Sequence, residues 1–328
     1  MKWTFNIGLF SKYRTELMGV ATILIIICHI PIFGVDMPHW MNTLMSSCGF
    51  GVDMFLFLSG LGIYNSYRKR TKYKTSIVRW FMLRYLRIMC PLVILVSPFV
   101  AYHLFLGQQW VVFAIVQLSG FGPLFGNGAL WFIPCILLLY FITPLVYCLI
   151  DGKRKWPYLI VLSFFCYFFA YLPPNDDILH FIVNRWPIYF LGFALADSVS
   201  KEKESSVSVF VIWPLSVYVL LYVVNHKAGT HFCLFGLQGV IMVAVFAILI
   251  NAVRNIRLNA LLKFFGLISL ESYITNEYIL RALQSVSWQI RGVDISLGNW
   301  TFYIVGTFLC VMISFIVHRL SKRILMFV

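Results

Sequence analysis

The feature that most constrains this chain is a series of apolar stretches, each about 20 residues long, which recurs along the whole sequence. A helix needs about 20 apolar residues to cross the hydrocarbon core of a bilayer. Ten stretches meet this requirement, at residues 15–34, 47–66, 79–103, 129–150, 157–173, 178–197, 207–225, 231–252, 264–283 and 299–318. The sequence therefore predicts an all-α, polytopic membrane helix bundle of about ten transmembrane helices, built as a single domain over residues 1–328.

Composition agrees with this prediction. Hydrophobic residues make up 61% of the chain and charged residues 12%, whereas soluble domains are about 25% charged. The eight cysteines are scattered, mostly within apolar stretches, and no two are spaced as Cys-x-x-Cys. We therefore expect neither a disulfide framework nor a metal site.

Residues 104–128 are apolar but interrupted by five glycines and a proline. Irregular backbone at membrane depth must be buried in protein or line a cavity. We interpret this segment as external or re-entrant. The alternative, a full span, would move every later loop to the opposite side of the membrane.

The positive charges support an orientation. With the N-terminus inside and ten spans, 22 of the 26 basic residues fall in or next to inner segments. Cytoplasmic loops are enriched in lysine and arginine, so both termini are expected in the cytoplasm. The net charge of +14 is then explained by orientation and by attraction to anionic membrane lipid, and it does not indicate nucleic acid.

The first apolar stretch has ionisable residues at both ends. It begins near Arg14 and ends on His29, about 22 Å further along a helix. Arg14 is expected at the cytoplasmic surface, as a topology anchor or as a ligand for an anionic substrate. An imidazole inside a transmembrane helix is costly and usually functional. We interpret His29 as a catalytic base, the alternative being a neutral ring that hydrogen-bonds to a neighbouring helix.

The second stretch carries one carboxylate, Asp53, about one turn inside its outer end. A carboxylate at this depth can orient an imidazole and stabilise its protonated form. Asp53 is therefore a candidate partner for His29, although it can equally cap the start of its own helix. We interpret Ser59-Gly60 as a place of close helix packing rather than as a nucleophile.

Two arginines, Arg84 and Arg87, begin the third stretch on its cytoplasmic side. Residues three apart share one helix face, and arginines grip phosphates with paired hydrogen bonds. Topology and lipid attraction explain the basic residues before them more fully than they explain these two. They are candidates for binding a phosphorylated substrate.

The ninth stretch is unusually polar and contains Glu271, Asn276 and Glu277. Two buried carboxylates without partners would be costly. Arg281 lies one turn beyond Glu277 and is expected to pair with it. Glu271 is the deeper acid and is a second candidate to orient His29.

Taken together, these features resemble the membrane-bound acyltransferase family 3, which includes polysaccharide O-acetyltransferases of bacterial surface glycans. The motifs follow the family's order and cover nearly the whole chain. They are Gly19-Val-Ala with His29, Gly51-Val-Asp-Met-Phe with Ser59-Gly60, Arg84-x-x-Arg87 with Pro91, Leu130-Trp-Phe-Ile with Tyr140 and Pro144, and Ser269-x-Glu-x-Tyr273.

The resemblance implies an O-acyltransferase in the bacterial cytoplasmic (inner) membrane. An acyl group, expected to be acetyl, would pass from cytoplasmic acetyl-CoA to a hydroxyl of a cell-surface or exported glycan, or of a lipid-linked saccharide. No metal would be needed. The expected site comprises catalytic His29, Asp53 and Glu271, with His29 as general base, and donor-binding Arg14, Arg84 and Arg87.

Two positions depart from the family pattern. The family usually has an arginine eleven residues before the histidine, where this chain has Met18. Either Arg14 and Glu16 take over its work, or the donor is held differently. The family's tail motif often ends in a second histidine, where this chain has Asn276. A hydrogen-bonding role can be transferred to Asn276, but a base role cannot.

Two other functions remain open from the sequence. One is a transporter or flippase for a lipid-linked glycan, with the buried polar residues lining its path; no paired, interrupted helices of inverted repeats support it. The other is a structural membrane partner, for which His29, Asp53 and Arg87 would be dispensable. The sequence indicates neither the acceptor sugar nor the oligomeric state.

Overall fold

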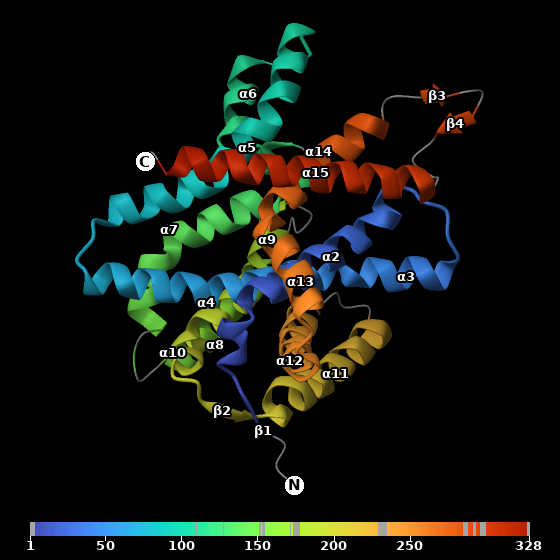
Figure 1. Cartoon of the computed structure of the whole chain (residues 1–328). Coiled ribbons are helices and arrows are strands. Elements are labelled where there is room, and N and C mark those ends of the chain that lie inside the picture. The colour runs from blue at the N-terminus through green and yellow to red at the C-terminus, as the bar shows by residue number, and fades with distance from the viewer. Residues whose placement is uncertain are drawn as a thin grey trace. The chain divides into compact units, whose positions relative to one another are not determined.

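The computed structural model of the chain is almost entirely helical (Figure 1). It describes residues 4–326 except 109, 127, 151, 153–154, 171, 173–177, 229–234, 285–287, 291–292 and 296–299. The first residues of the expected stretches 231–252 and 299–318, and the last of 157–173, lie outside the described residues. The predicted all-α fold class is confirmed.

Four three-residue strands accompany the helices. In chain order the elements are β1 (Thr4–Asn6), α1 (Leu9–Lys12), α2 (Arg14–Ile32), α3 (His39–Ser47), η1 (Cys48–Phe50), α4 (Gly51–Lys72), α5 (Ile77–Phe105), α6 (Val111–Leu118), η2 (Gly122–Phe125), η3 (Gly128–Leu130), α7 (Phe132–Ile150), α8 (Lys155–Ala170), α9 (Ile178–Val183), α10 (Trp186–Ser200), β2 (Glu204–Ser206), η4 (Ser208–Ile212), α11 (Trp213–Ala228), α12 (Phe235–Val253), α13 (Ile256–Leu267), α14 (Ser269–Gln284), β3 (Trp288–Ile290), β4 (Val293–Ile295) and α15 (Trp300–Leu325).

Seven helical segments in the described residues are long and apolar enough to cross a membrane. They are Arg14–Ile32, His39–Lys72, Ile77–Phe105, Phe132–Ile150, Ile178–Ser200, Gly236–Val253 and Trp300–Leu325. Each coincides with one of the ten predicted stretches. Two further predicted stretches form shorter apolar helices, Lys155–Ala170 and Ser208–Val223.

The remaining predicted stretch, residues 264–283, contains α14. This helix has only 16 residues and carries Glu271, Glu277 and Arg281, which explains why it is too short and too polar to stand among the seven. Each of the ten predicted stretches thus contains a helix in its described residues, but ten crossings and the cytoplasmic position of both termini stay predictions.

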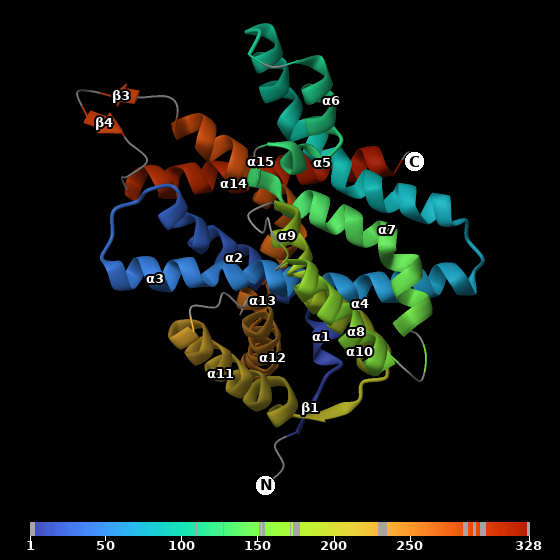
Figure 2. The same ribbon diagram turned by 180° about the vertical axis from the view of Figure 1, so that it is seen from behind.

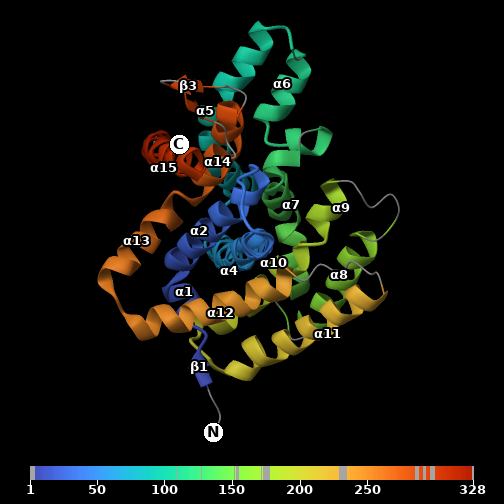
Figure 3. The same ribbon diagram turned by 90° about the vertical axis from the view of Figure 1, so that its right-hand side faces the viewer.

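The described part of the segment expected to be external or re-entrant contains no full span. Helix α5 continues to Phe105, and the eight-residue helix α6 runs back beside the C-terminal end of α5 (Figures 1 and 3). Eight residues rise about 12 Å, less than half the thickness of the hydrocarbon core. The short 3-10 helices η2 and η3 follow α6.

The described chain divides into two compact units, each assembled from separate parts of the sequence. Unit 1 comprises residues 1–21, 50–80 and 138–266, and unit 2 comprises 22–49, 81–137 and 267–328. In unit 1, α4 packs against α10 and α12, and α11 lies beside α12 (Figures 2 and 3). Strands β1 and β2 pair antiparallel, with Phe5 opposite Ser205.

Close contact between α4 and α10 depends on two glycines. A Cβ atom added at Gly60 would lie 2.2 Å from the backbone oxygen of Tyr189, and one added at Gly192 would lie 2.2 Å from that of Phe57. Small residues at helix interfaces allow backbones to approach in this way. The prediction that Ser59-Gly60 serves helix packing is confirmed for Gly60.

Replacing Gly192 by alanine is expected to destabilise unit 1 by about 1–3 kcal/mol, because the new methyl group forces α4 and α10 apart. Gly236→Ala is the matched control, since a Cβ there would lie 3.9 Å from its nearest neighbour. Thermal unfolding of the purified protein in detergent gives the melting temperature of both variants. Equal melting temperatures for the two variants would contradict the packing argument.

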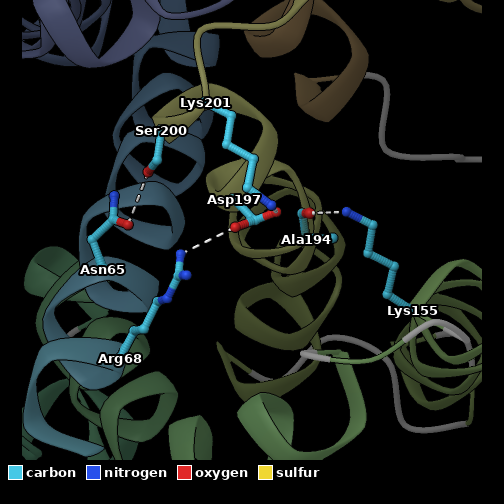
Figure 4. Close-up of polar contacts among 7 residues, drawn as sticks. All are labelled: Asn65, Arg68, Lys155, Ala194, Asp197, Ser200 and Lys201. Carbon is cyan, nitrogen blue, oxygen red and sulfur yellow. Dashed lines mark hydrogen bonds and ion pairs between the residues drawn. The ribbon is translucent and has the colours of Figure 1, made fainter. Parts of the chain in front are cut away.

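A cluster of polar side chains joins the C-terminal ends of α4 and α10 in unit 1 (Figure 4). The carboxylate of Asp197 accepts from Arg68 at 3.0 Å and from Lys201 at 2.8 Å. The Ser200 hydroxyl donates to Asn65, and Lys155 donates to the backbone oxygen of Ala194. The Arg68 side chain is 50% exposed, so its ion pair contributes only about 0–1 kcal/mol.

In unit 2, α14 packs along α15, and an apolar core forms around residues of α2, α14 and α15. Its fully or nearly buried members include Phe33, Leu280, Tyr303 and Cys310. Strands β3 and β4 form an antiparallel hairpin between the two helices. This core fixes the last turns of α2 against α14, which is the setting of His29.

Candidate active site

His29 contacts a buried amide in unit 2. Nδ2 of Asn276, on α14, lies 3.3 Å from Nδ1 of His29, and Asn276 is only 1% exposed. The ring of Phe33 meets the imidazole edge-on, with centroids 6.1 Å apart. One turn before the histidine, the hydroxyl of Tyr303 donates to the backbone oxygen of Ile26 at 2.6 Å. The hydrogen-bonding role expected for Asn276 is confirmed.

The orientation of the Asn276 amide determines which imidazole nitrogen is available. If Nδ2 donates to Nδ1, the neutral ring carries its proton on Nε2 and cannot accept another there. Oδ1 of Asn276 has no partner among the described residues. An amide turned by 180° would place Oδ1 against a protonated Nδ1 and leave Nε2 as the basic nitrogen.

Glu271 lies elsewhere on α14. Its Oε1 is 3.0 Å from Nδ1 of His318 on α15, and the carboxylate is almost fully buried. Five residues, or about 7.5 Å of helix rise, separate Glu271 from Asn276. In the described residues it is Asn276 that contacts His29, and orientation of His29 by Glu271 stays a prediction.

The face of α14 between these two positions is also hydrogen-bonded to α15. The hydroxyls of Thr275 and Ser314 are 2.8 Å apart, and Ser314 donates to the backbone oxygen of Cys310. On the other side of Asn276, Glu277 pairs with Arg281, as its spacing predicted. Glu271, Thr275 and Glu277 of α14 are thus paired with neighbours, which helps to explain how so polar a helix is buried.

Two of the sequence motifs meet at Tyr273. Its hydroxyl donates to the backbone oxygen of Ala129 and accepts from the backbone N–H of Phe132, both at 3.3 Å. These contacts link α14 to the start of α7 and to the turn that contains Trp131. These hydrogen bonds of Tyr273 therefore hold α14, the helix that carries Asn276, against the start of α7.

Asp53 lies in unit 1, where it forms an ion pair with Arg185 at the start of α10. The Asp53 side chain is 0% exposed and that of Arg185 is 5% exposed. Asp53 stands in the first turn of α4, but the N-cap of this helix, Phe50, makes no side-chain cap. The ion pair accounts for the burial of the carboxylate; orientation of His29 by Asp53 stays a prediction.

Arg14 lies against the backbone of α4 in unit 1. Its Nε donates to the carbonyl oxygen of Leu58 at 3.0 Å, and its guanidinium fills the space above Gly62. Two residues on, the buried carboxylate of Glu16 lies 3.5 Å from Nζ of Lys263. Arg14 thus joins two helices, and its expected contact with a donor phosphate stays a prediction.

Arg84 and Arg87 both lie on α5 and belong to unit 2. Arg87 is exposed and Arg84 is partly buried. The neighbouring Tyr85 donates to the backbone oxygen of Ser119, which ties this turn of α5 to the end of α6. Both arginines are placed one turn apart, as a pair that binds phosphate requires, and their role stays a prediction.

Comparison with known families agrees with this arrangement of motifs. The sequence matches the profile of a family described as an acyltransferase domain, acyltransferase family 3, over residues 17–319. The chain belongs to acyltransferase family 3. No curated protein and no solved structure gave a match.

As a member of acyltransferase family 3 with several apolar membrane-length helices, the chain is a multi-pass membrane acyltransferase. The matched region includes His29, Asp53, Glu271 and the arginine pair, whereas Arg14 lies just before it. Among the described residues, no group of three or more His, Cys, Asp or Glu side chains could hold a metal ion.

Sequence reasoning missed two partners, Arg185 and His318. A signal for the first was present, because Arg185 is the only Asp, Glu, Lys or Arg in residues 178–196 and a buried carboxylate needs a cation. His318 carried no comparable signal, since it lies at the end of its helix among exposed basic residues. Its contact with Glu271 follows from the packing of α15 on α14.

Proposed function

We propose that this acyltransferase moves an acetyl group from cytoplasmic acetyl-CoA to a hydroxyl of an exported or cell-surface saccharide, in the bacterial inner membrane. The observation that carries the proposal is the imidazole of His29 held by a buried amide on a second helix. A ring fixed in this way suits general-base catalysis, because a general base must be held within hydrogen-bond reach of the proton that it removes.

In the proposed reaction, Nε2 of His29 removes the proton from the acceptor hydroxyl while the oxygen attacks the thioester carbonyl. Nδ1–H donates to Oδ1 of Asn276, which keeps the ring in the required tautomer. Collapse of the tetrahedral intermediate breaks the carbon–sulfur bond, and the proton passes from the imidazolium to the CoA thiolate. The products are the acetyl ester and CoA.

Replacing Asn276 by leucine is expected to lower kcat by about 10- to 100-fold, because the ring loses the partner that fixes its tautomer. Replacing it by aspartate should preserve kcat better, since a carboxylate oxygen can only accept from Nδ1–H. Steady-state rates of both variants test this. Equal losses for leucine and aspartate would contradict the tautomer argument.

The donor site is proposed at Arg84 and Arg87, which would hold CoA phosphates at the cytoplasmic end of α5. Loss of one charged hydrogen bond to phosphate costs about 1.5–3 kcal/mol. Arg84→Gln and Arg87→Gln are therefore each expected to raise the KM for acetyl-CoA about tenfold or more. Arg79→Gln, an exposed arginine on the same helix, is the control and should leave this KM unchanged. A normal KM in both variants would remove the proposed donor site.

The function itself is tested with the purified protein in nanodiscs, radiolabelled acetyl-CoA and chemically deacetylated surface glycan from the cells that produce it. Label is expected in the glycan as an ester released by mild base. A protein that moves a lipid-linked saccharide across vesicles but transfers no label would be a flippase, and the proposal would be wrong.

A further inference from the structure

Buried polar atoms without hydrogen-bond partners gather on helices α4 and α12 and at the junction of α9 and α10, all in unit 1. Among the described residues, each of these atoms is shielded from solvent and none has a partner. They are Oδ1 of Asp53 on α4, Nδ1 of His180, Oδ1 of Asn184 and Nε1 of Trp186 at the α9–α10 junction, and Oε1 of Gln238 on α12. We call these five residues the polar cluster.

Contacts within unit 1 bring the helices that carry the polar cluster together. The α9–α10 junction is tied to α4 through the ion pair of Arg185 with Asp53, and Arg185 stands between Asn184 and Trp186. On the other side, a Cβ atom added at Gly239 would lie 2.8 Å from Cβ of Asp53, so the residue beside Gln238 touches Asp53.

So many unpartnered buried polar atoms in one part of the structure are unusual. Native proteins pair the great majority of their buried polar groups, with other protein groups or with ordered water. Elsewhere in the described chain such atoms occur singly, on Asn259, Asn276, Thr307 and Ser321. Five on adjacent helices mark a place that holds polar molecules, either ordered water or the polar groups of a ligand.

The chemistry of the cluster selects the kind of molecule. Asp53, Asn184 and Gln238 offer acceptor oxygens, Trp186 offers an N–H donor, and the ring nitrogen of His180 can serve either way. Nε2 of Gln238 is engaged with the hydroxyl of Tyr218 at 3.0 Å, so its oxygen is the end left for a ligand. Phosphate and carboxylate ligands bring only acceptors and would face the Asp53 carboxylate. Hydroxyl groups both donate and accept, and several of them at fixed spacing match this set.

Two side chains of the cluster are held in place by aromatic contacts. The His180 ring stacks on Phe169 with centroids 4.8 Å apart, and the Trp186 ring packs on Phe190. The Arg185 guanidinium lies 4.7 Å from the centre of the Phe181 ring. Polar groups held in place by surrounding aromatic side chains are typical of small-molecule binding sites.

We propose that the polar cluster is a subsite that binds the hydroxyl groups of a neutral saccharide ring. In the expected topology these residues lie toward the outer ends of their helices, where an exported saccharide arrives. That the bound saccharide is the acyl acceptor rests on the proposed function; the binding itself does not. Asp53 then binds a saccharide hydroxyl through Oδ1 while Oδ2 holds Arg185.

Binding is tested by thermal unfolding of the purified protein with methyl glycosides of glucose, galactose, mannose and N-acetylglucosamine. Sorbitol at equal concentration controls for general stabilisation by polyols. At least one glycoside is expected to raise the melting temperature of the wild type by a few degrees more than sorbitol does. The extra rise should disappear in Asn184→Leu and Gln238→Leu. It should persist in Asn259→Leu, which alters a comparable amide on α13. No glycoside exceeding sorbitol, or a rise retained in both cluster variants, overturns the subsite.

A kinetic readout separates this proposal from the proposed function. Asn184→Leu and Gln238→Leu are expected to raise the KM for the glycan acceptor about tenfold without a matching rise in the KM for acetyl-CoA. Glycoside binding without acetyl transfer by the wild type would retain the subsite and reject the acyltransfer reaction. Normal transfer with an unchanged acceptor KM in both variants would reject the subsite alone.

Discussion

Replacing His29 by alanine is expected to abolish acetyl transfer to the glycan while the protein remains inserted and folded. A general base contributes about 10²- to 10⁴-fold to a proton-transfer step, so the residual rate should be below about one hundredth of the wild type. Alanine removes the base but leaves the surrounding core of Phe33, Leu280 and Tyr303 intact. Label transfer from radioactive acetyl-CoA and thermal unfolding, measured on the same preparation, give the two quantities.

His39→Ala is the matched control, because this histidine is exposed on α3 and no role is assigned to it. It should retain both transfer and melting temperature. Substantial transfer by the His29 variant would overturn the mechanism. A loss of transfer accompanied by unfolding would instead assign His29 a structural role. His29→Gln tests this independently, because glutamine keeps hydrogen-bonding capacity but cannot act as a base.

Replacing Arg185 by leucine is expected to destabilise the protein by about 3–5 kcal/mol. The substitution leaves the carboxylate of Asp53, which is 0% exposed, without the cation beside it. Replacing both members of the pair, as Asp53→Asn with Arg185→Met, should recover most of this loss, because no buried charge then remains. Thermal unfolding in detergent distinguishes the single from the double variant.

Arg68→Leu provides the comparison, since it breaks an ion pair that is half exposed to solvent (Figure 4). Its expected cost is about 0–1 kcal/mol. If Arg185→Leu destabilises the protein no more than Arg68→Leu does, the argument that Arg185 neutralises the buried Asp53 charge is wrong. The same holds if the double variant is less stable than Arg185→Leu.

The helices could be predicted from the sequence because the signal for each is local. An uninterrupted apolar stretch such as Val20–Cys28 or Phe132–Ile150 has no stable alternative to a helix in a bilayer, since every backbone group must be paired within the segment. Helix α14 was also located, although its polarity hides it from a count based on hydropathy alone.

Partners across helices could be predicted only where spacing along one helix decided them. The Glu277–Arg281 pair is such a case, because four residues bring two side chains onto one face. The contacts of Asp53 with Arg185 and of Glu271 with His318 join residues 132 and 47 positions apart, and no local pattern encodes which of several candidates meets which. The Asn276 contact was foreseeable only because the family pattern marks that position.

The separation of His29 from Asn276 has a consequence for biosynthesis. These residues are 247 positions apart, and a ribosome needs roughly 10 to 50 s to traverse that length. Throughout this interval the imidazole is in the nascent chain without the amide that orients it. An arrested or truncated translation product therefore carries His29 without the amide that contacts it in the folded protein.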